Sequence, residues 1–305
     1  MMTKQKILVV GSSNTDMVIQ TEHLPRPGET VLGGTFFMNP GGKGANQAVA
    51  VARLGGQITF ICKTGSDIFG HQAHQLFEEE GINTSYVLSD SKNPSGVALI
   101  TVDSRAENCI AVASGANMNL SPEDLRRAKE AISEADIILM QLEIPIETVE
   151  YVARVANEQG KKVILNPAPA QPLSPELIRD LYLITPNETE AEMISGVTIT
   201  DDESAVEAAR KIAALGVDNV VITLGARGAL VHNAETNEFV DGYKVNAIDT
   251  TAAGDIFNGA LAVALAENRS LIDAVRFACK TSAISVTRVG AQSSAPYRTE
   301  VDIFG

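Results

Sequence analysis

A single carboxylate stands among small residues near the end of the sequence, in the stretch AIDTTAAGDIFNGALA at positions 247–262. Asp255 follows Ala252, Ala253 and Gly254, and it precedes an apolar run that predicts a helix over residues 256–266. The first amides of a helix lack intrahelical acceptors, and with the helix dipole they attract anions. A phosphoryl group could therefore sit on these amides while Asp255 takes a proton from an attacking hydroxyl. Simple helix capping by Asp255 accounts for the same pattern without catalysis.

A second glycine-rich segment, NPGGKGANQA at positions 39–48, also offers exposed amides, ahead of a helix predicted over residues 45–54. Its glycines permit a close approach of the backbone to a ligand. Such a turn suits hydroxyls or phosphates, with Lys43 as a charged contact and Asn46 as both donor and acceptor. It is not a Walker A loop, because Gly42-Lys43 is followed by Gly44 instead of Ser or Thr. The GxGxxG fingerprint is missing too, which argues against a nicotinamide enzyme.

Six short apolar runs alternate with segments of helical period, and these elements must position the two turns. The runs cover residues 6–11, 58–65, 136–143, 162–169, 181–188 and 219–228, and the helical segments cover residues 45–54, 67–80, 122–134, 146–158 and 203–215. Near-continuous Val, Ile and Leu indicate strands that are covered on both faces. The alternation therefore predicts a three-layer α/β/α fold with a mostly parallel central sheet.

Two stretches, residues 16–38 and 95–113, break that rhythm. Their residues alternate in the way typical of exposed antiparallel strands, with Gly and Pro punctuation and no helix signal. We expect a small β flap at the edge of the main sheet, although edge hairpins without a function would look alike. No linker or internal repeat is visible, so residues 1–305 are expected to form one domain with this appendage.

Polar residues follow most of the predicted strands. In an open parallel sheet, ligands collect beyond the carboxyl ends of the strands. The residues found there are Asn14, Asp16, Glu143, Asn166, Asn187, Glu190, Gly225 and Arg227. Capping and turn chemistry account for any one of them. Polar loops after so many strands favour a ligand site along that edge.

Composition limits the partners. The formal net charge of −14, from 24 basic and 38 acidic residues, argues against binding to a nucleic-acid backbone, but a local site for a small anion is compatible with it. Cys62, Cys109 and Cys279 are too widely spaced for a zinc knuckle or a disulfide framework. No apolar run approaches the roughly 20 residues of a membrane helix. We therefore expect a cytoplasmic protein that binds neither nucleic acid nor membrane.

Taken together, GGKGANQA and DTTAAGD resemble the motifs of the ribokinase family of carbohydrate kinases, which is also named after the minor phosphofructokinase. GSSNTDMV, the NETE motif at residues 187–190 and TLGARG extend the resemblance from Lys6 to Pro296. The resemblance implies a ribokinase-like fold and ATP-dependent phosphorylation of D-ribose at its 5-hydroxyl. Asp255 matches the general base of the family, and Ala252, Ala253 and Gly254 match its anion hole.

The resemblance also assigns binding positions. For the sugar these are Asn14, Thr15, Asp16, Gly42, Lys43, Gly44, Ala45, Asn46, Glu143 and Asp255. For the nucleotide they are Asn187, Glu190, Thr223, Leu224, Gly225, Ala226, Arg227, Gly228, Gly254, Asp255 and, as a loose match, Cys279. Glu190 and Asn187 match the motif tied to Mg²⁺ through water. A K⁺ site beside the anion hole matches Asp249, Thr251, Ser285, Arg288, Gly290 and Ser294, where Arg288 would contribute its carbonyl.

Two positions depart from the family pattern. Ala252 stands where the wider family has Gly, and Ile256 stands where Thr is common after the base. Neither change removes a group that the chemistry needs. The β flap matches the lid of the family, which closes over the sugar and pairs with a second lid in a homodimer.

Two kinds of alternative stay open. Sibling kinases of the family act on deoxyribose, fructose or a nucleoside, and a nucleoside would need a pocket for its base. A non-catalytic sugar-sensing or nucleotide-sensing protein on the same scaffold would not need a base. The presence of Asp255 after Ala253-Gly254 favours an enzyme.

Overall fold

The computed structural model describes residues 5–105 and 107–304. Its main body is a nine-stranded sheet in the order β13-β12-β11-β10-β9-β8-β1-β4-β5. The strands are β1 Lys6–Val10, β4 Gln57–Gly65, β5 Asn83–Asp90, β8 Ile137–Met140, β9 Lys162–Leu165, β10 Leu183–Ile184, β11 Asn219–Thr223, β12 Gly228–His232 and β13 Asn237–Asp241. Neighbours from β5 to β11 run parallel, and β12 and β13 add an antiparallel edge. The predicted mostly parallel sheet is confirmed.

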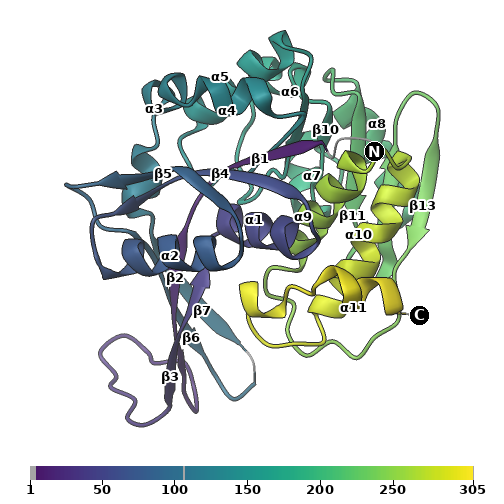
Figure 1. Ribbon diagram of the computed structural model, residues 1–305. Coiled ribbons are helices and arrows are strands. Elements are labelled where there is room, and N and C mark those ends of the chain that lie inside the picture. The colour runs from purple at the N-terminus through teal and green to yellow at the C-terminus, as the bar shows by residue number, and fades with distance from the viewer. Residues whose placement is uncertain (1–4, 106, 305) are drawn as a thin grey trace.

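Helices cover both faces of this sheet, as the unbroken apolar strands require. In β1, Ile7 and Val9 join one hydrophobic cluster, and Leu8 and Val10 join the cluster on the opposite face. One layer contains α1 Lys43–Arg53, α2 Ile68–Glu79, α9 Ala253–Ala266, α10 Leu271–Ser285 and α11 Arg298–Ile303. The other contains α3 Pro122–Arg127, α4 Lys129–Glu134, α5 Ile146–Glu158, α6 Pro175–Arg179 and α8 Asp202–Ala213 (Figure 1). The three-layer α/β/α prediction is confirmed.

Several predicted boundaries were wrong. The helix predicted over residues 122–134 is broken at Ala128, where the backbone leaves helical geometry. The strand predicted to reach residue 188 ends at Ile184, and residue 188 instead starts α7 (Glu188–Ser195). The strand predicted over residues 219–228 ends at Thr223, before a 3₁₀ turn. Strands β5, β12 and β13 were missed. β5 and β13 are partly exposed edge strands without a continuous apolar run, whereas β12 is buried but has only five residues and begins with Gly228.

The predicted flap is a separate four-stranded sheet, which we call the lid, in the order β3-β2-β6-β7. Its strands are β2 Asn14–Gln20, β3 Thr35–Gly41, β6 Gly96–Val102 and β7 Asn108–Ala113. It projects from one side of the body, and β2 follows β1 after only three residues (Figure 1). The expectation of antiparallel pairing fails at the centre of the lid, where β2 and β6 run parallel.

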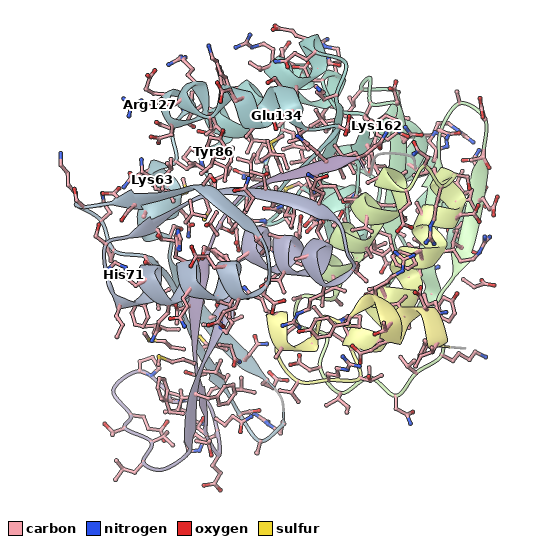
Figure 2. The ribbon with its side chains drawn as sticks, viewed as in Figure 1. Lys63, His71, Tyr86, Arg127, Glu134 and Lys162 are labelled. Carbon is pink, nitrogen blue, oxygen red and sulfur yellow. The ribbon has the colours of Figure 1, made fainter. Side chains whose placement is uncertain are left out.

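Charged side chains line the outer surface of the body. Arg127, with a side chain that is 78% exposed, and His71 on α2 both lie at the periphery (Figure 2). Among the described residues, no helix has the length and hydropathy needed to cross a bilayer.

Candidate active site

The turn that carries the base lies at the start of α9. This helix begins at Ala253, three residues earlier than predicted, and Ala252 caps it with a left-handed backbone, φ 59°. Non-glycine residues seldom adopt that conformation. The Ala253 amide donates to the Thr250 carbonyl at 3.2 Å. In the described chain, the amides of Ala252, Gly254 and Asp255 have no acceptor. The predicted anion hole included the amide of Ala253, but that amide is occupied. The amide of Asp255, which was not predicted, is free instead.

The Asp255 carboxylate is only 5% exposed and is held by two amide side chains of α1. Asn46 Nδ2 donates to Oδ2 at 2.9 Å, and Gln47 Nε2 donates to Oδ1 at 3.0 Å. Burial raises the pKa of Asp255, while the charge of Lys43 and the two amide donors oppose the rise and Glu143 adds to it. The result is a fixed carboxylate that is more basic than one in water.

The glycine-rich turn packs directly against the end of β1. Gly42, the N-cap of α1, has φ 88°, and a Cβ there would lie 2.7 Å from the Asn14 nitrogen. A Cβ on Gly44 would lie 2.5 Å from the Ser12 nitrogen. Only glycine fits at both positions, because L side chains rarely adopt the first backbone conformation and the second leaves no space. The close packing brings the amides of the turn to the carboxyl end of β1.

Glu143 connects three segments of the site. Its Oε2 accepts from Ser12 Oγ at 2.5 Å and from the Lys43 amide at 3.0 Å. Ser12 Oγ in turn accepts from the Gly44 amide at 3.3 Å. Glu143 therefore holds the start of α1 against the end of β1. Ser12, which follows β1, is not among the binding residues expected from the sequence.

Ala45 differs from its neighbours in the turn. Its side chain is fully buried in the core, and its amide donates to the Ser12 carbonyl at 2.8 Å. Both groups are thus occupied within the fold. The structure gives this predicted sugar contact a packing role instead.

One cation lies among the acids of the site. Burial lowers the pKa of Lys43, but Asp255, Glu143 and Glu190 together raise it above its usual value. Burial, Glu143 and Asp255 raise the pKa of Asp16 to about 6. The structure therefore brings together acids predicted from four separate parts of the sequence. Carboxylates that lie close enough to shift one another's pKa suit the binding of a polyol through its hydroxyls.

Asn14 and Asp16 enter the site from β2, with Thr15 half-buried between them. Asn14 Oδ1 accepts from Asn117 Nδ2 at 2.7 Å. Asn117 is 1% exposed and also bonds the Ser13 carbonyl and amide, at 3.1 and 2.9 Å. Asn117 is not among the residues expected from the sequence, because nothing in its polar loop separates it from ordinary turn residues.

The second half of the site surrounds the start of α7. Asn187 caps this helix and forms a reciprocal pair with Glu190: Asn187 Oδ1 accepts at 2.8 Å and the Asn187 amide donates at 2.9 Å. Burial raises the pKa of Glu190, opposed by the Asn187 amide and Lys43. Asn187 also bridges to Thr223 at the end of β11. The NETE motif and the TLGARG turn are therefore adjacent.

Two predicted nucleotide contacts are less well placed. Arg227 is exposed in the turn Gly225–Arg227, and its guanidinium pairs with Asp202 and Glu188, each at 2.8 Å. Cys279 lies on α10 within the hydrophobic core, and burial raises the pKa of its thiol to about 12. The other residues of the predicted nucleotide segment, residues 223–228, follow β11. Leu224 is buried, Ala226 lies in the turn and Gly228 starts β12.

The predicted cation residues gather beside the base turn. Asp249 accepts from the Thr251 amide at 2.9 Å and from the Gly290 amide at 2.8 Å. Burial raises its pKa, but these hydrogen bonds outweigh burial and lower it, so Asp249 is ionised. Arg288 pairs with Glu300 through its guanidinium, so only its carbonyl could serve a cation. Asp249 therefore ties the loop before α9 to the loop after α10.

The remaining predicted cation ligands are two serines. The Ser285 hydroxyl donates to Ser282 O at 2.8 Å, and the Ser294 hydroxyl donates to Ala291 O at 2.7 Å. With their protons engaged in this way, the two hydroxyl oxygens keep their lone pairs for a further contact. Among the described residues, no three His, Cys, Asp or Glu side chains group as metal ligands.

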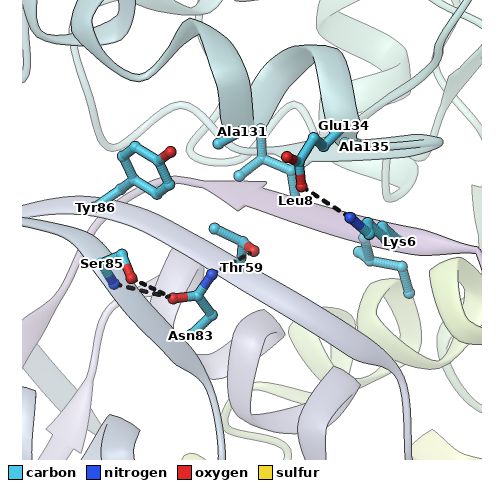
Figure 3. A pocket seen from close by; sticks show the side chains of 10 residues that line it. Lys6, Leu8, Thr59, Asn83, Ser85, Tyr86, Ala131, Glu134 and Ala135 are labelled. Carbon is cyan, nitrogen blue, oxygen red and sulfur yellow. Dashed lines mark hydrogen bonds and ion pairs between the residues drawn. The ribbon is translucent and has the colours of Figure 1, made fainter.

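A hollow of about 150 Å³ lies at the opposite ends of the strands, between Lys6, Thr59, Asn83 and Glu134 (Figure 3). Its polar groups bond one another: Lys6 Nζ pairs with Glu134 at 2.8 Å, and Asn83 Nδ2 donates to Thr59 Oγ1 at 3.2 Å. The hollow thus lies away from the carboxyl ends of the strands, the edge at which open parallel sheets bind ligands.

The chain is similar over nearly its whole length to known carbohydrate kinases. The family profile described as pfkB family carbohydrate kinase matches residues 4–298. The ribokinase of Haemophilus influenzae is 47% identical over 297 residues, which cover 97% of each chain. The deoxyribokinase of Salmonella typhi is 38% identical over 95% of each chain. The structure of Arabidopsis thaliana ribokinase with ribose and ATP superposes with a TM-score of 0.91, at 32% identity over 98% of each chain.

Proposed function

The chain belongs to the pfkB family of carbohydrate kinases, and we propose that it transfers the γ-phosphoryl group of ATP to the 5-hydroxyl of D-ribose. The observation that supports this most is the position of Asp255. Its buried carboxylate faces the polar sugar-binding residues, and free amides flank it in the same turn. The similar proteins named ribokinase, one of them solved with ribose and ATP, support the choice of substrates.

In the proposed reaction, Asp255 accepts the proton of the 5-hydroxyl as that oxygen attacks the γ-phosphorus. A new P–O bond to the sugar forms and the bond to the β-phosphate oxygen breaks, so that ADP leaves. The free amides of Ala252, Gly254 and Asp255 stabilise the charge that develops on the transferred group. Asp255 then carries the proton that the product has lost.

The sugar would be held by side chains from the lid strand, α1 and the loop after β8. These are Asn14, Asp16, Asn46 and Glu143, with Thr15 and the turn of residues 42–44 beside them. The amides of Lys43 and Gly44 already donate to Glu143 and Ser12, so the turn would serve the sugar through Gly42 and the Lys43 side chain. Asn46 Oδ1 is buried and has no partner in the described chain. An unpaired buried acceptor costs stability, so it supports a hydroxyl donor on the ligand at that point.

ATP would lie on the other side of Asp255, against Asn187, Glu190 and residues 223–228. Glu190 Oε1 makes no hydrogen bond in the described chain, which leaves an oxygen for water-bound Mg²⁺. Mg²⁺ bound there would neutralise phosphate charge. We assign Cys279 and Arg227 only peripheral nucleotide roles, because one is in the core and the other is paired with acids.

We also propose that K⁺ binds beside the base turn. The donor set fits a weakly bound monovalent ion: one ionised carboxylate, Asp249, and backbone carbonyls such as that of Arg288. K⁺ would complement the charge of Asp249. Residues 249 and 251 would then fix the turn that presents the free amides.

We propose that the lid and the body form one catalytic domain and that the protein is cytoplasmic. We also propose that two copies form a homodimer through their lids. Ile19, Phe36, Met38 and Leu99 are exposed and, from the strand register, share one face of the lid. Such an apolar face suits burial against a second copy.

Initial rates on D-ribose, deoxyribose, fructose and adenosine, with and without K⁺, test the proposal. We expect the highest kcat/KM for ribose, and a higher rate with K⁺. The similarity to a deoxyribokinase makes deoxyribose the second candidate. A higher kcat/KM on deoxyribose would reassign the substrate, and turnover of none of these acceptors would support a sensor.

A further inference from the structure

We infer that Gln47 is a positioning residue for Asp255. A chain of buried side chains also connects this pair to the first turn of α9. The members of the chain are Gln47, Asn166, Thr185 and Asn258. The inference rests on the proposed role of Asp255 as the general base, and it concerns what holds that base in place.

Gln47 lies on α1 and is completely buried. Its Nε2 donates to Asp255 Oδ1 at 3.0 Å and to Asn166 Oδ1 at 3.2 Å. Its Oε1 accepts from Gln141 Nε2 at 2.6 Å. An ionised carboxylate only accepts hydrogen bonds, so the nitrogen of Gln47 must face Asp255. With bonds at both ends of its amide, Gln47 has one orientation available.

The chain then returns to the base turn from the other side. Asn166 Nδ2 donates to the Thr185 carbonyl at 3.3 Å, and Thr185 Oγ1 donates to Asn258 Oδ1 at 2.6 Å. Asn258 Nδ2 donates to the Gly254 carbonyl at 2.8 Å. In a trans peptide, the carbonyl and the following N–H point in opposite directions. The bond from Asn258 therefore holds the peptide group to which the Asp255 amide belongs, with that amide pointing away from Asn258.

Both ends of the chain thus act on Asp255, one on its carboxylate and one on its amide. All four members of the chain are buried, and so is Gln141. Hydrogen bonds in such surroundings are strong and geometrically demanding. A displacement of one member would move the proton acceptor relative to the amides that hold the phosphoryl group.

The charges around Asp255 show why its donors matter. Lys43 faces it from α1, while Glu143 after β8, Asp16 on β2 and Glu190 on α7 are acidic. One cation therefore opposes three acids and burial. Asn46 and Gln47 supply the donors that favour the ionised base. Asn46 is also expected to contact the sugar, so Gln47 is the donor that is independent of the substrate.

The first test replaces Gln47 with Met, which has a similar length and no donor. At neutral pH we expect kcat on ribose to fall on the order of 10- to 100-fold, with the ribose Kd from calorimetry within about threefold. Without the donor the ionised base is less stable, so the acid limb of the kcat/KM profile should move up by about one pH unit.

Gln141→Met is the matched control, because it removes a buried glutamine that bonds Gln47 but not Asp255. It should lower Tm to a similar extent without moving the acid limb. If Q47M loses activity equally at every pH, or keeps kcat within about threefold of the wild type, Gln47 is only structural and the inference fails.

The second test addresses the chain and does not depend on Q47M folding. Thr185→Val keeps the shape and removes the hydroxyl that bonds Asn258. We expect kcat to fall by about fivefold or more, with the KM for ribose unchanged. In the double variant Q47M/T185V, the fold loss in kcat should be smaller than the product of the two single losses by more than about threefold. An unchanged kcat in T185V, or kcat losses that simply multiply in the double variant, would show that the chain does not act on Asp255.

Asp255→Asn separates this inference from the proposed function. If D255N turns over normally, Asp255 is not the base and the proposed mechanism fails. If D255N is inactive while Q47M keeps the wild-type kcat and pH profile, only the positioning role is lost.

Discussion

At the scale of the residue, Asp255 combines burial with two amide donors, so its carboxylate is both basic and fixed in position. Asp255→Asn keeps the size of the side chain and removes the proton acceptor. We expect kcat to fall on the order of 10²–10⁴-fold, the contribution of a general base. Ribose should still bind within a few-fold of the wild-type Kd.

Coupled measurement of ADP release gives kcat in that experiment, and calorimetry gives the sugar affinity. Asn187→Ala is a useful comparison, since it alters the nucleotide side of the site and should raise the KM for ATP instead. A D255N enzyme with more than a tenth of the wild-type kcat would contradict general-base catalysis by Asp255.

Asp16 leads to a prediction about stability and pH. Its pKa is raised to about 6 by burial and by Glu143 and Asp255, so the ligand-free fold prefers the neutral acid. Stability from this group is fully present only below about pH 4, the ordinary range of an Asp pKa, and is lost as pH rises to about 6. Asp16→Asn should therefore raise Tm at pH 8, with a much smaller difference from the wild type at pH 4.

Differential scanning calorimetry across pH 4–8 measures this difference, and ribose affinity should fall in the same variant. Asp90→Asn is a surface control of opposite sign, because backbone and side-chain donors lower the pKa of Asp90 to about 2. A D16N protein that is less stable than the wild type at pH 8 would show that the Asp16 carboxylate is stabilising.

At the scale of the element, the site depends on how closely α9 packs against α1. A Cβ on Gly259 would lie 2.7 Å from the Ala50 Cβ and 2.9 Å from the Gln47 carbonyl. Gly259→Ala should push the helix of the base away from its donors. We expect a loss of about 1–3 kcal/mol in stability from overpacking, and a larger fall in kcat than rise in KM.

Urea unfolding and steady-state kinetics measure the two effects. Ala260→Gly, one position along α9, is the matched control: it destabilises the helix without adding atoms between α1 and α9. An equal loss of kcat in the control would mean that stability alone, and not the separation of the helices, lowers activity.

Elements were predictable from the sequence where burial is complete. The strands at residues 6–11 and 58–65 and the helix at residues 146–158 match, because their apolar periodicity follows directly from contact with the core. The strand at residues 181–188 was predicted, but its early end at Ile184 and the early start of α9 were not predictable. They depend on partners distant in the chain and on a left-handed alanine that no local rule favours.

The site was predictable to the extent that it lies in turns with restrictive sequences. Gly42, Gly44 and Asp255 stand in runs of small residues. Few kinds of turn need such runs, so the sequence alone marks these positions. Asn117 and Gln47 were missed as functional groups because their importance comes from a tertiary hydrogen bond. A buried polar residue looks the same in a sequence whatever its partner.

At the scale of the whole molecule, the exposed apolar face of the lid predicts self-association. Leu99→Lys places a charge in the middle of this face, where the side chain is exposed. If two lids pair there, sedimentation velocity should show a shift from dimer to monomer, and KM for ribose should rise as closure weakens.

Arg127→Glu, a charge change on the far side of the body, is the control and should leave the sedimentation coefficient unchanged. A wild-type protein that sediments as a monomer, or an L99K variant that stays dimeric, would place the contact elsewhere or remove it.

The chain passes between body and lid at four points: before β2, after β3, before β6 and after β7. Sugar-site groups sit at the first two crossings, Asn14 at one and Gly42 at the other, and Asn117 follows the last. The lid is therefore not a module that can be transplanted from one kinase to another. Replacing the lid of this enzyme would also move the residues of the proposed sugar site, so the lid and the sugar specificity must be redesigned together.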